Sequence, residues 1–304
     1  MFTCKPHTRI IDLVNVLPVN PHGYCMGVHA ALSLALKTKR QYPDRDVYML
    51  GLLVHNETAV EFLKEHGLIP LDETKQSILD HILDRKEGDV VIFSAHGHPS
   101  AYEDLAKAKG LIVVDATCRY VQENLLAALS SPPPIIYLGV AGHLESEAFL
   151  ANCPDANFYD VKGGRCDLLR AKGQGKDPLV VTQTTLSGGE IDAAMEEIRK
   201  IFPNAKLLKS RCLATQMRQD AMAHIPEDVD AVIVLGSNRS NNSLKLAEIA
   251  KAQGFTTYLC LGLEQVKSLD LRKTRRVALS SGASTSNQTF QEVLNYLRSV
   301  PVEG

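Results

Sequence analysis

Short apolar runs alternate with longer amphipathic segments along the 304 residues of the chain. Each run ends in polar or turn residues, which predicts strands over 14–19, 47–51, 89–93, 135–139, 178–181, 231–236 and 276–279. Apolar residues at helical spacing predict helices over 28–36, 58–66, 74–84 and 121–129. Because parallel neighbours need crossover connections of helix size, this alternation predicts an α/β fold with mainly parallel sheets.

Three cysteines stand at equivalent points of this pattern, each directly before a helical segment. Cys25, Cys118 and Cys212 are separated by 93 and 94 residues. The next strand ending in Leu-Gly follows each cysteine by 26, 21 and 24 residues, and the next Ser- or Thr-rich strand end follows by 69, 64 and 68 residues. These spacings indicate an internal repeat. We expect a first unit with an N-terminal extension, a second unit, a third unit and a C-terminal tail over residues 1–111, 112–207, 208–292 and 293–304.

Composition narrows the class of protein. Apolar residues make up 45% and charged residues 22% of the chain, as in ordinary globular proteins. A net charge of -2 gives no case for a nucleic-acid partner, which usually needs a basic face. No apolar run approaches the ~20 residues of a membrane span. The N-terminus lacks the apolar core of a secretion signal, so we expect no membrane partner and a cytoplasmic location.

The cysteines favour metal or catalytic chemistry. Seven cysteines are spread through the chain, which favours reduced thiols over a disulfide framework. Ligands of parallel sheets bind beyond the carboxyl ends of the strands, so the three units are expected to face one shared cavity. Three thiolates meeting there suit a soft metal centre. A closed zinc site normally has four ligands, whereas an iron–sulfur cluster with three thiolates leaves one iron open. Unrelated buried cysteines are the alternative.

The other residues at the predicted strand ends are mostly neutral hydrogen-bond donors. They are His55, His96, His143, Thr184, Ser240, Asn241, Asn242 and Ser284. Several convergent donors and helix N-termini suit a phosphate or diphosphate, although each residue alone also suits a helix cap. Glu145 is the one carboxylate inside these clusters and could hold a proton for delivery, or be a solvated loop acid. Asp115 is expected to cap a turn.

These residues together resemble the 4-hydroxy-3-methylbut-2-enyl diphosphate reductase family, the last enzyme of the methylerythritol phosphate route to isoprenoids. The matching motifs run in order from about residue 15 to 290. They lie at residues 23–28, 54–56, 94–97, 115–118, 142–145, 182–185, 214–219, 240–243 and 282–285. Each motif is short, but nine motifs in the same order make the resemblance specific.

The resemblance implies a trefoil of three pseudo-equivalent α/β domains around a central cavity that holds a [4Fe-4S] cluster. It implies that the cluster is bound by Cys25, Cys118 and Cys212. Glu145 would be the proton source, with His143 and Thr184 beside it at the substrate. The diphosphate would be bound by His55, His96, Ser240, Asn241, Asn242 and Ser284. Ferredoxin or flavodoxin would deliver two electrons, and the allylic alcohol would become isopentenyl or dimethylallyl diphosphate.

The chain departs from the family pattern at a few positions. Arg119 and Tyr120 follow the second cysteine where Pro is usual, Leu144 replaces Pro, and Ala148 replaces Gly. Asn241 stands where many members have Ser, although some carry Asn. These changes bear on the cavity wall and the substrate range more than on the reaction type. A family relative acting on a different allylic diphosphate and an iron–sulfur redox sensor without turnover are the alternatives.

Overall fold

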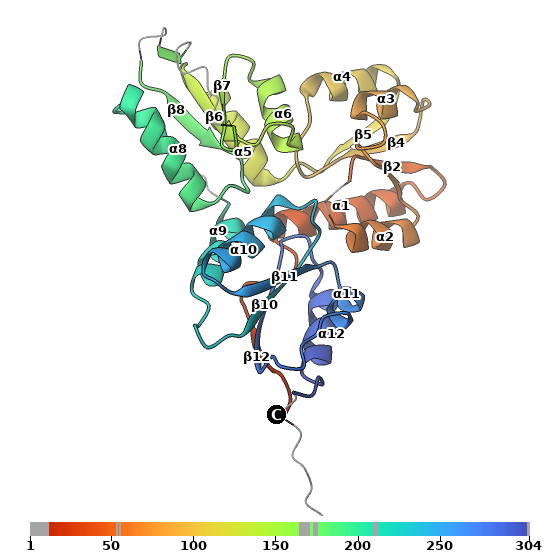
Figure 1. Cartoon of the computed structure of the whole chain (residues 1–304). Helices are drawn as coiled ribbons and strands as arrows, with labels where there is room; N and C mark the ends of the chain where they lie inside the picture. The colour runs from red at the N-terminus through yellow and green to blue at the C-terminus, as the bar shows by residue number, and fades with distance from the viewer. Residues whose placement is uncertain are drawn as a thin grey trace, which may run out of the picture.

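The computed structural model describes residues 12–52, 54, 56–163, 171–172, 176–208 and 212–302. Figure 1 shows these residues as three lobes around a common centre. In the described part of the chain, the named strands form three four-stranded sheets, and every pair within a sheet is parallel. The predicted α/β architecture with parallel sheets is therefore confirmed.

The first sheet has the order β3-β2-β4-β5. Its strands are β2 (Val47–Leu50), β3 (Ile69–Leu71), β4 (Val90–Phe93) and β5 (Ile112–Asp115). The helices of this part of the chain are α1 (Met26–Gln41), α2 (Glu57–Glu65), α3 (Ile78–Leu83) and α4 (Ser100–Ala108). Strand β4 is buried along its whole length, with Ile92 packed on one face and Phe93 on the other. A central parallel strand that is covered on both faces typically consists of apolar residues along its whole length.

The second sheet has the order β7-β6-β8-β9. Its strands are β6 (Ile135–Gly139), β7 (Asn157–Asp160), β8 (Leu179–Thr182) and β9 (Lys206–Leu207). The described helices here are α5 (Arg119–Leu129), α6 (Leu144–Asn152) and α8 (Gly188–Ile201). Helix α8 begins with a capping box between Ser187 and Glu190, and it buries Ile191, Met195 and Ile198 against the sheet.

The third sheet has the order β1-β12-β10-β11. Its strands are β1 (Asn15–Pro18), β10 (Ala231–Leu235), β11 (Thr256–Cys260) and β12 (Arg276–Ser281). Its helices are α9 (Leu213–Ala223), α10 (Asn241–Ala252), α11 (Leu263–Lys267) and α12 (Asn287–Leu297). No helix in the described part of the chain combines the length and apolarity needed to cross a membrane.

The strand that precedes each cysteine pairs with the sheet of the preceding unit. β5 pairs with β4, β9 pairs with β8, and β1 pairs with β12, which closes the order from the last unit back to the first. β5 therefore lies in the first sheet, although the expected boundary put residue 112 in the second unit. A short apolar run fits the edge of either sheet, so the pattern alone could not decide between them. We propose that the boundaries between the three units follow the sheets and not the positions of the cysteines.

The expected C-terminal tail lies partly in the core of the third unit. Helix α12 extends to Leu297, and Val293 and Leu297 are fully buried. Beyond the helix, Val14 N donates to Val300 O at 3.0 Å, and Leu13 and Pro301 form an antiparallel bridge. The described part of the segment after residue 292 therefore packs with the third sheet.

Some elements differ from their prediction. The strands that are missing from the predicted set all lie at sheet edges, where a strand is less buried than a central one; they are β3, β5, β7, β9 and β11. The helix expected over 74–84 begins only at Ile78, with Ser77 as its N-cap. Before it, the Asp72 carboxylate accepts hydrogen bonds from the Thr74 N–H and hydroxyl and holds a turn instead.

Candidate functional site

Each of the three repeat cysteines is the N-cap residue of a helix. Cys25 precedes α1, Cys118 precedes α5 and Cys212 precedes α9. All three line one cavity of about 110 Å³ between the lobes. Among the described residues these cysteines form no disulfide. The structure thus brings together three thiols that lie nearly a third of the chain apart, each at the positive end of a helix dipole.

The packing around the thiols is close. A Cβ added at Gly27 would lie 2.6 Å from Cys118 Sγ and 3.9 Å from Cys25 Sγ. Burial first, and then the charges of Cys212, Cys25 and Glu145, raise the pKa of the Cys118 thiol to about 11, although a backbone hydrogen bond from Tyr120 lowers it. Three thiolates repel one another, so they need a cationic centre between them. The three cysteines are therefore a suitable donor set for a metal centre.

The three thiols are a donor set that an iron–sulfur cluster can use. Within the described ranges, no three His, Cys, Asp or Glu side chains are grouped closely enough to hold one metal ion. In an iron–sulfur cube each thiolate binds a different iron, so the sulfurs lie farther apart than the ligands of one ion. Three cysteines that face one cavity from three helices could offer one thiolate to each of three irons.

Glu145 is a buried carboxylate in the same cavity, only 3% exposed. Its two oxygens accept from the Thr184 N–H and the Thr184 hydroxyl, each at 2.8 Å. Burial raises the pKa of Glu145 to about 7, although both hydrogen bonds from Thr184 lower it. A group with this pKa can give up a proton near neutral pH.

His143 is the N-cap of α6 and lies beside Glu145. Its Nδ1 accepts from the Glu145 backbone N–H at 3.2 Å. This assignment leaves the proton of the neutral ring on Nε2, which is then a donor. The His96 ring lies edge-on to His143 with a centroid distance of 6.0 Å, and both rings line the cavity.

The N-terminus of α10 forms another wall of the cavity. Ser240 is the N-cap and accepts from the Ser243 N–H, and Asn241 and Asn242 follow it. Asn242 is 5% exposed, and neither of its amide atoms has a hydrogen-bond partner among the described residues. A buried amide of this kind is costly unless a ligand bonds to it. Ser284 lines the same cavity and is buried.

Two glycines let α10 begin directly against the sheet. A Cβ at Gly236 would lie 2.2 Å from Ser243 Oγ, and a Cβ at Gly282 would lie 2.1 Å from the same atom. These glycines follow β10 and β12, so the amide end of α10 reaches the carboxyl ends of the strands. Such an end is a ready anion site.

Not every predicted residue can be placed. His55 lies outside the described residues, although its neighbours Val54 and Asn56 are described and Val54 lines the cavity. Leu144 and Ala148 line a second cavity of about 740 Å³, which shares His143 with the first. Arg119 is exposed and pairs with Glu123 at 2.6 Å. Asp115 caps its turn as expected, by accepting from the Thr117 N–H at 2.8 Å.

Arg218 on α9 lies in the motif at residues 214–219, but it is not among the predicted site residues. Its side chain is buried, and it donates to Gly23 O at 2.7 Å and to Ala214 O at 2.9 Å. Its Nε has no partner among the described residues. Burial lowers the pKa of Arg218, whereas the charges of Cys25 and Cys212 raise it. The motif does not predict the burial of Arg218, because an arginine in a helix is ordinarily exposed.

Comparisons with known proteins agree with this arrangement. The model of the family described as LytB protein matches residues 16–298. A 4-hydroxy-3-methylbut-2-enyl diphosphate reductase of Symbiobacterium thermophilum is 35% identical over 297 residues, which cover 95% of this chain and 99% of the relative. The enzyme of the same name from Lysinibacillus sphaericus is 34% identical over 290 residues, covering 93% of this chain and 88% of the relative.

Two solved structures share the fold. The E-1-hydroxy-2-methyl-but-2-enyl-4-diphosphate reductase of Plasmodium falciparum superposes with a TM-score of 0.79 at 27% identity, covering 93% of this chain and 88% of that one. A structure of (E)-4-hydroxy-3-methyl-but-2-enyl diphosphate reductase, the terminal enzyme of the non-mevalonate pathway, gives a TM-score of 0.67 at 27% identity, covering 95% of this chain and 100% of that one. The match over most of the chain and the identity to its relatives show that the chain belongs to the LytB protein family.

Proposed function

We propose that this chain reduces (E)-4-hydroxy-3-methylbut-2-enyl diphosphate to isopentenyl and dimethylallyl diphosphate. The names of its relatives support this activity. One observation carries the proposal for this chain: a buried carboxyl with a pKa of about 7 shares a small cavity with three convergent thiols and an unpartnered amide. The overall change replaces the substrate hydroxyl by hydrogen, with two electrons and two protons consumed and one water released.

Cys25, Cys118 and Cys212 would hold a [4Fe-4S] cluster in this cavity. When bound, such a cluster supplies one-electron transfer and an iron with an open coordination position that acts as a Lewis acid. The thiols must lose their protons when they bind iron, which a thiol with a pKa of about 11 resists unless the metal is present. The guanidinium of Arg218 adds a positive charge beside two of them. Ferredoxin or flavodoxin is the proposed electron donor.

The remaining residues bind the substrate and move the proton. Ser240, Asn242 and Ser284 offer donors to the diphosphate at the N-terminus of α10, where the helix dipole also favours an anion. His55, His96 and Asn241 are the further proposed contacts. Holding the diphosphate, which does not react, orients the C–O bond at the other end of the substrate.

Glu145 would protonate the departing hydroxyl so that it leaves as water. Hydroxide is a poor leaving group, and a neutral carboxyl is the form that can donate. Thr184 fixes the carboxyl through both of its oxygens, and His143 lies at its backbone N–H. A redox sensor without turnover needs neither this buried acid nor an anion site, so the combination favours the enzyme.

The test is an anaerobic assay of the cluster-loaded protein with reduced methyl viologen. We expect turnover of the hydroxylated C5 diphosphate by the unchanged chain and a loss of about 10²- to 10⁴-fold in Glu145→Gln, with the same cluster absorption in both. The exposed variant Glu264→Gln on α11 is the control and should keep full activity. No turnover by a fully loaded unchanged chain would refute the proposal. Turnover of only a different allylic diphosphate would change the substrate and keep the reaction class.

A further inference from the structure

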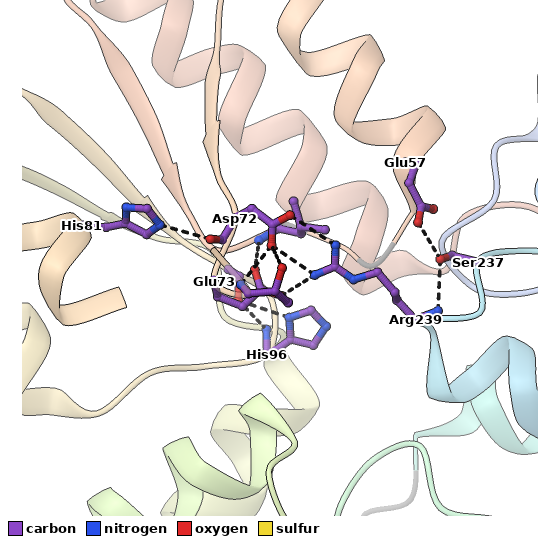
Figure 2. A network of polar contacts seen from close by, with 10 residues as sticks. Glu57, Asp72, Glu73, His81, His96, Ser237 and Arg239 are labelled. Carbon is purple, nitrogen blue, oxygen red and sulfur yellow. Dashed lines mark hydrogen bonds and ion pairs between the residues drawn. The ribbon is translucent and has the colours of Figure 1, made fainter. Parts of the chain in front are cut away.

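The loop between β10 and α10 contacts the first unit at two points. The Arg239 guanidinium donates to the Glu73 carboxylate at 2.9 Å and to the two oxygens of Asp72 at 3.3 and 3.5 Å. Two residues earlier, the Ser237 hydroxyl donates to Glu57 Oε1 at 3.0 Å. Figure 2 shows Arg239 reaching from the third unit toward both carboxylates, with the Ser237–Glu57 contact beside it. We call these contacts the 239 bridge.

The first-unit side of the 239 bridge is held in place. Glu73 accepts from the Leu52 N–H at 2.8 Å through its other oxygen. Burial acts to raise the pKa of Asp72, but the hydrogen bonds from Thr74 and the Arg239 guanidinium outweigh it and hold the pKa at about 2. Glu57 is the first residue of α2. Leu52 and Glu57 flank Val54, which lines the thiol cavity, so the bridge is attached on both sides of that wall.

The third-unit side leads directly to the proposed diphosphate contacts. Arg239 is followed by Ser240, the N-cap of α10. The Arg239 N–H donates to the Ser237 hydroxyl at 3.1 Å, and the Ser240 N–H donates to Ser237 O at 3.1 Å. The loop is therefore rigidly coupled to the start of α10, and a shift of Arg239 moves Ser240 and the residues after it.

We propose that Arg239 is a positioning residue, whose ion pairs with Asp72 and Glu73 hold the start of α10 against the first unit at the spacing a diphosphate requires. This inference rests on the proposed function. The Arg239, Asp72 and Glu73 side chains are 28%, 23% and 11% exposed, so the network is less screened than an ordinary surface pair. A planar guanidinium can join two carboxylates at once, which a lysine ammonium does less well.

The charge of Arg239 offers a second effect that must be separated from positioning. Without the guanidinium, Asp72 and Glu73 would be two uncompensated negative charges close to an anion site. Arg239→Gln removes both the bridge and the charge. Arg239→Gln combined with Glu73→Gln restores the net charge without restoring the bridge, and the glutamine can still accept from the Leu52 N–H. Arg239→Lys keeps the positive charge but loses the planar guanidinium that joins the two carboxylates.

The experiment measures binding of inorganic diphosphate to the anaerobic, cluster-loaded protein by calorimetry, together with KM and kcat for the substrate. For Arg239→Gln we expect Kd and KM to rise about tenfold while kcat stays within about twofold, because ground-state placement is lost. The double variant should remain weakened and Arg239→Lys should be intermediate. Lys267→Gln, which breaks the exposed Lys267–Glu264 pair, is the control and should match the unchanged chain. The cluster absorption should be the same in all of them.

Three results would overturn the inference. Arg239→Gln could bind diphosphate as tightly as the unchanged chain. The double variant or Arg239→Lys could return to full affinity, which would assign the whole effect to charge. Arg239→Gln could lose kcat and cluster absorption in proportion to affinity, which is the result of a general loss of structure. If the unchanged chain bound no diphosphate, the proposed function would be refuted. Measurement of the unchanged chain alone shows this, so it is distinguished from a failure of the inference on Arg239.

Discussion

Thr184 donates two hydrogen bonds to Glu145, one from its backbone N–H and one from its hydroxyl, each at 2.8 Å. Both stabilise the charged carboxylate, yet burial is stronger and leaves the pKa of Glu145 at about 7. The carboxyl is therefore held in one orientation and is still protonated in an appreciable fraction of molecules at neutral pH. Thr184 and Glu145 come from different strand ends of the second unit.

The pH dependence of turnover should report this carboxyl. The protonated form is the donor, so kcat/KM should be constant below the pKa of about 7 and fall about tenfold for each pH unit above it. A pH–rate profile with the artificial electron donor measures this limb. In Glu145→Gln the limb should vanish along with most of the activity. A limb of the same shape in that variant would assign the titration to another group.

Removing the Thr184 hydroxyl should move the limb in a defined direction. That hydroxyl lowers the pKa of Glu145, so Thr184→Val should raise it and shift the alkaline limb to higher pH. The backbone hydrogen bond remains, and kcat should fall less than in Glu145→Gln. Thr257→Val, on strand β11 outside the cavity, is the matched control and should leave the limb in place. A shift toward lower pH contradicts the assignment.

Gly27→Ala should impair cluster binding. Alanine is the better helix former by about 1 kcal/mol, so helix propensity alone predicts a more stable protein. Its Cβ, however, would lie 2.6 Å from Cys118 Sγ. Overpacking costs about 1–3 kcal/mol, and so close an approach belongs at the upper end. Iron and sulfide per chain should fall after anaerobic reconstitution.

The control for this variant is Gly188→Ala. A Cβ there meets no described atom within 4 Å, and Gly188 is the first residue of α8. Its iron content should equal that of the unchanged chain. Full iron loading of Gly27→Ala would show that the thiols do not converge as closely as described.

Arg218 should influence the reduction potential of the centre. Reduction adds negative charge, and a buried guanidinium beside Cys25 and Cys212 stabilises the reduced form. Arg218→Gln should therefore shift the midpoint potential to more negative values in an EPR-monitored titration, and Arg218→Lys should recover part of the shift. Arg119→Gln removes an exposed charge that directly follows Cys118 in the sequence, and it should have little effect. Equal shifts in Arg218→Gln and Arg119→Gln would rule out a specific role for Arg218.

Part of this site could be predicted because it depends on local pattern. The position of each cysteine at the start of a helix follows from apolar spacing, and the polar strand ends follow from the ordinary use of parallel sheets. The pairing of β5 with β4 could not be predicted, since it depends on which sheet offers a free edge. The burial of Arg218 and the contact between Arg239 and Glu73 join segments far apart in the chain. No local pattern encodes such contacts.

The strand before each cysteine belongs to the sheet of the preceding unit, and this has a mechanical consequence for the lobes. Where the polypeptide leaves one sheet for the next, after β5, β9 and β1, a cysteine follows the strand by three, five and seven residues. Each crossing point would thus also be an attachment point for the proposed cluster. Rotation of one lobe against its neighbour alters the separation of the sulfurs. We therefore expect that release of iron from such a cluster and loosening of the lobes are coupled.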